Sequence, residues 1–175
     1  MFNKAVMNKT VITFFLTIFI CSCSSTVNRN SSNYKVSNCP PDGICSLEVM
    51  KKKSIVIDVD ENNAIHYTLA DDPQHSVIIY NYKRNTSPSE VDGGYREVVL
   101  FEIDAKIKKQ NLSNEALQST KMLFGRFWFC RGQNGLFKIK EGNLDLNINK
   151  DNSDFQLDFK INEVPQVTSS IKTQE

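Results

Sequence analysis

Two cysteines separated by a short turn sequence are the side chains of this protein most clearly arranged for a covalent reaction. Cys39 and Cys45 bracket the segment PPDGI at 40–44. Proline fixes φ, aspartate hydrogen-bonds its own backbone and glycine accepts a positive φ, so this segment predicts a turn that brings the two thiols together. In an oxidising compartment such a pair becomes a disulfide. We therefore expect a Cys39–Cys45 disulfide that fixes the start of the first strand.

Two alternatives stay open for these thiols. A metal site at Cys39 and Cys45 would have an unusually long ligand spacing, and only His66 and His75 are available as histidine ligands. Cys130 is either a buried small side chain, a reactive thiol or the true partner of one of the other two cysteines. We expect no metal site and no cofactor, and we expect Cys130 to be buried and free.

No arrangement of nucleophile, acid and base is evident, and we expect no catalytic residue. The sequence lacks the Gly-x-Ser-x-Gly, His-Glu-x-x-His and phosphate-loop motifs. Asp58, Asp60 and Asn62 match the first ligands of a calcium-binding loop, but Asn63 and Leu69 replace its glycine and closing glutamate, so we expect a hairpin turn there. A hydrolase built on paired carboxylates stays an alternative, because the chain has 20 acidic residues.

The first 22 residues have the layout of an export signal. Lys9 gives a positive start, and the run from Val11 to Ile20 is apolar apart from Thr13 and Thr17. A membrane-spanning helix needs about 20 apolar residues, so this run is too short to remain as a span. Export to an oxidising compartment agrees with the predicted disulfide.

The residues that end this segment resemble the lipobox of bacterial lipoproteins. Ile20 stands at the aliphatic position, Ser22 is the small residue before the cleaved bond, and Cys23 is the modified cysteine. The resemblance implies removal of residues 1–22, a diacylglyceryl group on the Cys23 thiol and a further acyl chain, such as palmitate, on its new amino terminus. Two or more acyl chains anchor a protein stably to a membrane. Lipidation at Cys21 and a plain secretory signal are the alternatives.

The mature chain begins with a polar segment and has almost no net charge. Residues 23–38 are rich in serine and asparagine and predict a flexible tether. The whole chain has 21 basic and 20 acidic residues, and the signal removes two lysines and no acid. Nucleic-acid binders carry a clustered basic face, whereas the only basic run here is Lys51–Lys53. We therefore expect a membrane partner through the lipid anchor and no nucleic acid.

Alternation of apolar and polar residues with period two dominates residues 39–165 and predicts an all-β domain. We expect turns at 60–63, 71–74 and 134–135, a long loop at 85–94, one short helix within 112–120 and a disordered tail at 166–175. The predicted fold is a single antiparallel β-sandwich or an up-and-down, lipocalin-like barrel of about nine strands. The predicted strands are Leu47–Val49, Ile55–Val59, Ile65–Leu69, Ser76–Lys83, Tyr95–Asp104, Met122–Cys130, Leu136–Lys140, Leu144–Ile148 and Phe155–Ile161.

Aromatic residues on these strands are the candidate ligand contacts. The segment Met122–Cys130 is the densest apolar stretch, and its aromatics lie beside Arg126 and Arg131. Such a stretch is more often core than a stacking platform, because large aromatic side chains are usually buried. If a barrel holds a small apolar or sugar ligand, the expected contacts are Tyr80, Tyr82, Phe124 and Trp128.

The mature region also resembles small lipoproteins of Bacteroidetes-type bacteria. The resemblance depends on the Cys39–Cys45 spacing, on DGGYRE at 92–97 and on FCRGQ at 129–133. It implies a fold and an outer-membrane location, facing either the periplasm or the surface, and supplies no catalytic residue. The sequence therefore predicts an envelope lipoprotein that binds or scaffolds without catalysis, with a lipocalin-like carrier and a carboxylate-based hydrolase as alternatives.

Overall fold

The structure is a computed structural model that describes residues 35–87, 94–129, 132–148 and 153–174. The predicted signal, Cys23 and Cys130 lie outside these residues. No helix in the described ranges is long and apolar enough to cross a membrane.

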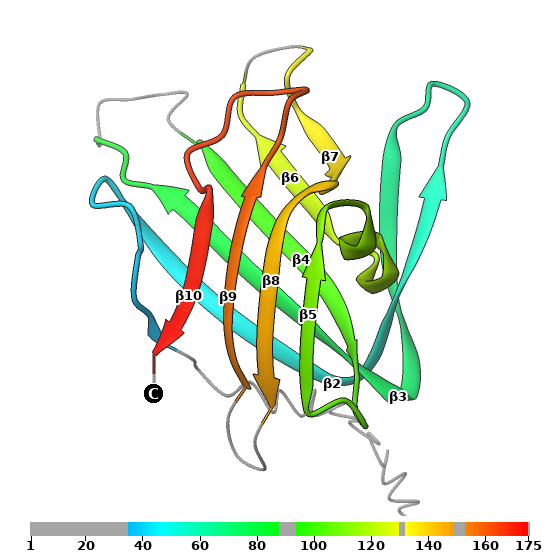
Figure 1. Cartoon of the computed structure of the whole chain (residues 1–175). Helices are drawn as coiled ribbons and strands as arrows, with labels where there is room; N and C mark the ends of the chain where they lie inside the picture. The colour runs from blue at the N-terminus through cyan, green and yellow to red at the C-terminus, as the bar shows by residue number, and fades with distance from the viewer. Residues whose placement is uncertain (1–34, 88–93, 130–131, 149–152, 175) are drawn as a thin grey trace, which may run out of the picture.

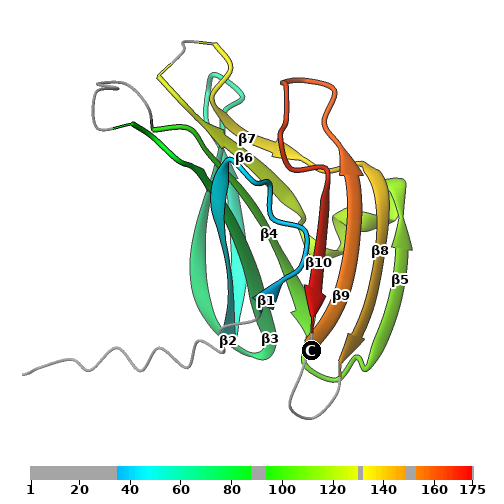
Figure 2. The same cartoon turned by 90° about the vertical axis from the view of Figure 1, so that its left-hand side faces the viewer.

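Two five-stranded antiparallel sheets pack face to face (Figures 1 and 2). The first sheet has the order β1-β10-β9-β8-β5, and the second has the order β2-β3-β4-β6-β7. In the first sheet the strands are β1 (Lys35–Val36), β10 (Ser170–Gln174), β9 (Ser153–Lys160), β8 (Glu141–Ile148) and β5 (Lys109–Ser113). In the second they are β2 (Gly43–Val59), β3 (Ile65–Arg84), β4 (Arg96–Asp104), β6 (Leu123–Phe127) and β7 (Gly135–Lys138).

This arrangement confirms the all-β prediction and takes the form of a sandwich. The two sheets do not close into a barrel (Figure 2). A single 3₁₀ helix, η1 (Asn114–Thr120), is the only helix in the described chain and lies within the predicted helical range. Ser113 occupies the N-cap position of this helix, and its side chain makes no capping hydrogen bond.

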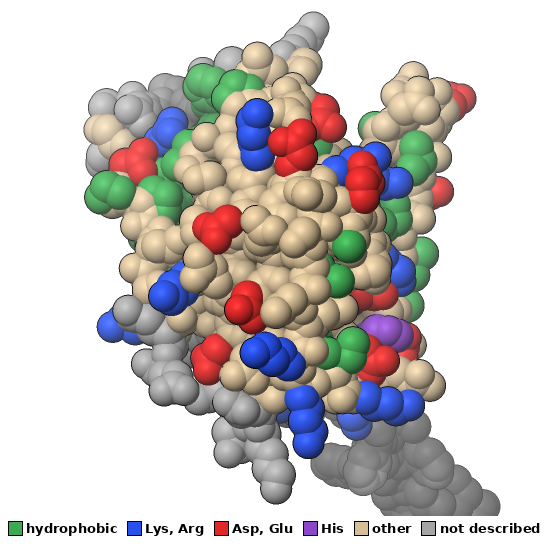
Figure 3. Space-filling model, in the orientation of Figure 1, with side chains coloured by type: hydrophobic (Ala, Val, Ile, Leu, Met, Phe, Trp, Pro, Cys, Tyr) green, Lys and Arg blue, Asp and Glu red, His purple; other side chains and the backbone are tan. Residues whose placement is uncertain are grey.

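The main core lies between the sheets and follows from the period-two pattern. On β8 and β9, Leu144, Leu146 and Leu157 are buried, whereas Asp145 and Gln156 between them are exposed. Alternate side chains of a strand point to opposite faces, so each strand contributes one apolar row to the core. The outer face of the first sheet is correspondingly polar, with scattered acidic and basic side chains (Figure 3).

The disulfide between Cys39 and Cys45 is present and confirms the prediction from the turn sequence. Their Cα atoms lie 5.7 Å apart. The turn at 60–63 is also confirmed, because the Asp60 carboxylate accepts hydrogen bonds from the backbone N–H groups of Asn62 and Ala64. Asn63 has a φ of 61°, in the left-handed region that asparagine tolerates.

The turn predicted at 71–74 is wrong, because β3 continues through it. β2 and β3 form one long hairpin with a bulge at Lys51/Lys53, where Lys52 has a φ of 59°. The register passes from Lys51↔Ser76 to Lys53↔Asp71, so Pro73 falls in the irregular part of the ladder. Proline is tolerated there because a bulge demands fewer ladder hydrogen bonds. Pro73 therefore marks a bend in a strand.

Beyond this bulge the hairpin forms an arm, residues 53–71, that returns along the outer face of the second sheet (Figure 1). Ile55, Ile57 and Tyr67 of the arm pack in a second apolar cluster with Val98 and Leu100 of β4. The second sheet is thus covered on one face by the first sheet and on the other by its own hairpin.

A salt bridge anchors the base of this arm. The buried Glu102 carboxylate of β4 accepts the Ile55 backbone N–H at 2.8 Å. Lys121 Nζ donates to the Ile55 carbonyl at 2.8 Å and lies 2.9 Å from Glu102 Oε1. The two side chains thereby satisfy the backbone groups that Ile55 presents away from β3.

The tail predicted at 166–175 is wrong, since Ser170–Gln174 form β10 between β1 and β9. Ile171 is fully buried, and Thr173 Oγ1 accepts the Phe155 backbone N–H. The segment reads as polar because only one of its faces is buried. β1 lies within the predicted tether and pairs with the same strand.

The connection between β6 and β7 is longer than the two-residue turn predicted at 134–135. β6 ends at Phe127 and β7 begins at Gly135, so Asn134 lies at the end of a longer loop. The Trp128 backbone N–H donates to Asn134 Oδ1 at 2.7 Å, and the Asn134 amide donates to the Trp128 carbonyl. Asn134 therefore closes this loop through its side chain.

Candidate binding site at the loop end of the sandwich

The most unusual side chains gather at one end of the sandwich, which we call the loop end. β2 begins, β3 ends, β4 begins and β6 ends there, and the loop 161–169 of the first sheet reaches it. We define the loop-end cluster as the following seven residues: Asp42, Tyr82, Arg84, Tyr95, Glu97, Arg126 and Trp128.

Strand register assembles the centre of this cluster. Glu97 of β4 lies opposite Tyr82 of β3 and opposite Arg126 of β6. Glu97 has the same parity along β4 as Val99 and therefore points toward the space between the sheets. A row of phenol, carboxylate and guanidinium thus crosses three neighbouring strands on their inner face.

Glu97 is fully buried, and its carboxylate joins the two sheets. Oε1 accepts hydrogen bonds from the Tyr95 hydroxyl at 2.5 Å and the Val167 backbone N–H at 2.6 Å, and Oε2 accepts the Thr168 backbone N–H at 2.7 Å. A buried carboxylate is tolerated only when its lone pairs are satisfied in this way. Glu97 therefore fixes the loop 161–169 against β4.

The Tyr95 hydroxyl bridges the buried Glu97 carboxylate and the buried Arg126 guanidinium. Its hydroxyl donates to Glu97 and accepts a long hydrogen bond of 3.4 Å from Arg126 Nε. Burial, followed by the hydrogen bond to Glu97, raises the pKa of Tyr95 to about 12. Arg84 lies 4.6 Å from the centre of the Tyr95 ring, and Arg126 lies 5.2 Å from it. The phenol stays neutral at ordinary pH and holds both guanidinium groups by cation–π contact.

Arg126 is only 4% exposed and fixes the position of Trp128. Its Nη1 donates to the Gln133 carbonyl at 2.9 Å and to Gln133 Oε1 at 3.1 Å, which ties it to the β6–β7 loop. The guanidinium carbon lies 5.6 Å from the centre of the Trp128 ring, and Tyr95 makes an edge contact with Trp128. Arg126 and Tyr95 therefore pack against the Trp128 indole and hold it in place.

Trp128 and Phe129 form the exposed apolar part of the site. Trp128 is 40% exposed and Phe129 is 76% exposed. Two adjacent large aromatics are rarely left open to water. A ligand or partner that covers this pair would meet a surface that is already ordered by Arg126 and Asn134.

Asp42, next to the disulfide, completes the cluster. It accepts the Tyr82 hydroxyl at 2.8 Å and Arg84 Nε at 3.2 Å. The hydrogen bond from Tyr82 is the main cause that lowers the pKa of Asp42. Burial and the bond to Asp42 raise the pKa of Tyr82. The turn that forms the disulfide thereby also supplies an anion that holds Arg84 beside Tyr95.

The four sequence-predicted ligand contacts fall into two groups. Tyr80, Tyr82 and Phe124 are buried in the core between the sheets, whereas Trp128 is exposed at the loop end. Tyr82 reaches the cluster through its hydroxyl, and Tyr80 contacts Cys45 Sγ at 3.1 Å. The structure therefore does not gather the four side chains around one cavity.

Sequence reasoning missed Glu97 and Tyr95 as members of the site. The available signal was Glu97 itself, a charged residue at a position whose strand neighbours of the same parity are apolar. An acid at an inward position must have partners. Its partners at 167 and 168 are far away in sequence, so nothing local identified them.

The two buried carboxylates of the described chain do not form a pair. Glu97 faces the first sheet, whereas Glu102 faces the arm, because their spacing along β4 places them on opposite faces. In the described residues no group of three or more His, Cys, Asp or Glu side chains is placed to hold a metal ion. The arrangement at the loop end is suited to recognition through aromatic and guanidinium surfaces.

No family model, curated protein or solved structure matches the chain.

Proposed function

We propose that this chain is a lipid-anchored protein of the bacterial outer membrane that binds a protein partner through Trp128 and Phe129. The observation that carries the binding proposal is the exposed Trp128–Phe129 pair, in which the Trp128 ring packs against the buried side chains of Arg126 and Tyr95. Residues of this kind dominate the binding energy of protein interfaces, where Trp, Tyr and Arg are enriched.

The position of the first strand supports an orientation in which Trp128 faces away from the membrane. Lys35 pairs with Gln174 at the end of β10, and the chain then runs along β10 until Asn38 bonds Ser170. β1 therefore starts at the end of the sandwich opposite the loop end (Figure 2). A lipid on Cys23 would hold that opposite end nearer the membrane and direct Trp128 away from it.

The packed interior favours binding at the surface over transport of a ligand inside. Tyr80 and Phe124 are almost completely buried and pack with neighbours from both sheets. A lipocalin-like carrier needs an interior space for its ligand. The carboxylate-based hydrolase receives no support from Glu97 and Glu102, because each is occupied by donors of the fold itself.

Site-specific photo-crosslinking in intact cells tests the proposal. A photoreactive amino acid at position 129 should give one discrete protein adduct, and Trp128→Ser in the same chain should greatly reduce it. The control is the same probe at Val59, an apolar residue on the arm that is 50% exposed. If position 129 gives no adduct, or gives the same adducts as position 59, the proposed partner surface is wrong.

A further inference from the structure

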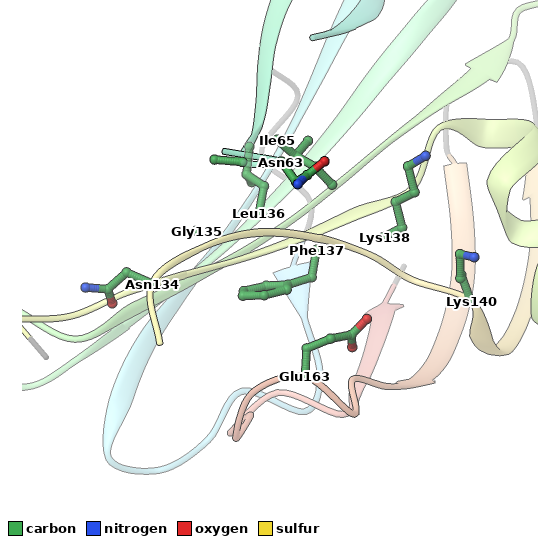
Figure 4. A pocket seen from close by; sticks show the side chains of 10 residues that line it. Asn63, Ile65, Asn134, Gly135, Leu136, Phe137, Lys138, Lys140 and Glu163 are labelled. Atoms are coloured by element: carbon green, nitrogen blue, oxygen red, sulfur yellow. The ribbon is translucent and has the colours of Figure 1, made fainter. Parts of the chain in front are cut away.

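A cleft of about 320 Å³ lies between the tip of the arm and β7 (Figure 4). One wall is Asn63, Ala64 and Ile65, and the opposite side is the whole of β7 with Asn134 before it. Lys140 and Glu163 complete its lining. Its volume is at the lower end of the range found for ligand sites, about 300–1,000 Å³.

The cleft runs along the free edge of β7. All four residues of β7 line it, although Leu136 packs toward the arm and Phe137 toward the main core. Side chains of both parities line one space only where that space follows the backbone edge of a strand. In the described part of the chain β7 is hydrogen-bonded to β6 alone, so no strand pairs with this edge.

The hydrogen-bond alternation identifies which backbone groups face the cleft. The Ile139 N–H donates to the Met122 carbonyl at 3.2 Å, and Phe137 lies opposite Phe124 in the same register. In an antiparallel pair, bonded and non-bonded positions alternate. Phe137 therefore bonds to β6, whereas the N–H and C=O groups of Leu136 and Lys138 point away from β6 and into the cleft.

The charges around this edge indicate the kind of strand it would accept. Lys138 and Lys140 line the cleft with Glu163 as its single acid, and Lys138 forms no ion pair with any described residue. Lys140 has only a 3.6 Å contact with Glu115. Ile65 and Leu136 give the same cleft an apolar side, and Figure 4 shows the Phe137 ring between β7 and Glu163.

We propose that the free edge of β7 binds an extended, acidic peptide segment of a partner protein as an added strand. Leu136 and Lys138 would exchange backbone hydrogen bonds with it, Lys138 and Lys140 would pair with its acidic side chains, and its apolar residues would contact Leu136 and Ile65. A second copy of this chain fits less well, because its own β7 edge would present lysines where Lys138 and Lys140 of the cleft need acidic partners. The proposal requires neither the lipid anchor nor the Trp128–Phe129 pair.

Amide chemical shifts of the purified mature protein, titrated with short capped synthetic peptides, test this proposal. The probe is a peptide in which valine alternates with aspartate or glutamate, and the controls are a valine–lysine peptide and an acidic peptide N-methylated at alternate backbone nitrogens. We expect the acidic peptide to shift the Leu136 and Lys138 amides and both control peptides to bind at least about tenfold more weakly. The valine–lysine peptide loses the charge-assisted contacts with the lysines, and the N-methylated peptide loses backbone hydrogen bonds to β7.

Lysine variants give a second, independent measurement. Lys138→Glu should weaken binding of the acidic peptide about tenfold, and Lys109→Glu, at the exposed edge of β5, should leave it unchanged. Lys140→Glu serves in the same way if Lys138→Glu does not fold. Absence of binding, equal binding of the N-methylated peptide, or shifts confined to another edge would each overturn the proposal.

Discussion

Removal of the charge on Lys121 should loosen the arm and lower the stability of the whole protein. Lys121→Met keeps the long aliphatic side chain and the same left-handed backbone, which has a φ of 52° at this residue. The substitution therefore removes the ammonium group without adding a change in backbone strain. The ammonium contacts Glu102 at 2.9 Å and the Ile55 carbonyl at 2.8 Å, and both contacts are lost.

The size of the expected loss in stability follows from how deeply Glu102 and Lys121 are buried. The Glu102 side chain is 8% exposed, whereas that of Lys121 is 41% exposed. Breaking a fully buried ion pair costs about 3–5 kcal/mol, and an exposed pair contributes about 0–1 kcal/mol. For this intermediate case we expect a loss of about 2 kcal/mol in the free energy of unfolding, equivalent to about 4–8 °C in Tm for a chain of this size.

Urea unfolding, together with hydrogen exchange at the Ile55 amide, measures the effect. The matched control is Lys53→Met, since Lys53 forms a 2.6 Å salt bridge with Asp71 and the Asp71 side chain is 91% exposed. That variant should change stability much less than Lys121→Met, because solvent screens an exposed pair. If Lys121→Met costs no more than Lys53→Met, or if the Ile55 amide exchanges no faster, then Glu102 and Lys121 do not anchor the arm.

Three further predictions concern the disulfide, the buried tyrosine and the lipid anchor. Paired Cys39→Ser and Cys45→Ser substitutions should lower the free energy of unfolding by about 2 to 2.5 kcal/mol, because the closed loop is short, and reductant should then have no additional effect on the variant. Spectrophotometric titration should show a tyrosine ionising near pH 12 that Tyr95→Phe removes. Because the pKa of Tyr95 is raised on folding, its contribution to stability is complete below pH 10 and should be lost as the pH rises from 10 to about 12. The wild-type protein should therefore lose stability more steeply than Tyr95→Phe over this pH range, and equal slopes would contradict the prediction. Cys23→Ala should abolish fatty-acid labelling and leave precursor in the membrane fraction, while Cys21→Ala should keep the label; loss of label in Cys21→Ala alone would move the lipidated position to 21.

The sequence alone was sufficient wherever the deciding interactions are local. The turn before Cys45 joins the thiols through a six-residue separation, and the turn at 60–63 is held by the side chain of Asp60. Period-two alternation located most strands, because a strand with one buried face must alternate whatever its partners are. These features depend on neighbouring residues and are therefore readable from a single chain.

Tertiary structure decided the features that depend on partners distant in sequence. Pro73 reads as a turn residue, yet the bulge at Lys52 accommodates it in a continuous strand. The sequence around Ile171 resembles a polar tail, but pairing with β9 and burial of Ile171 in the core make this segment the strand β10. Glu97 is stable only because the N–H groups of Val167 and Thr168 reach it from the other sheet. Burial of a charge and pairing of an edge are properties of the assembled sheets, so no local pattern could have specified them.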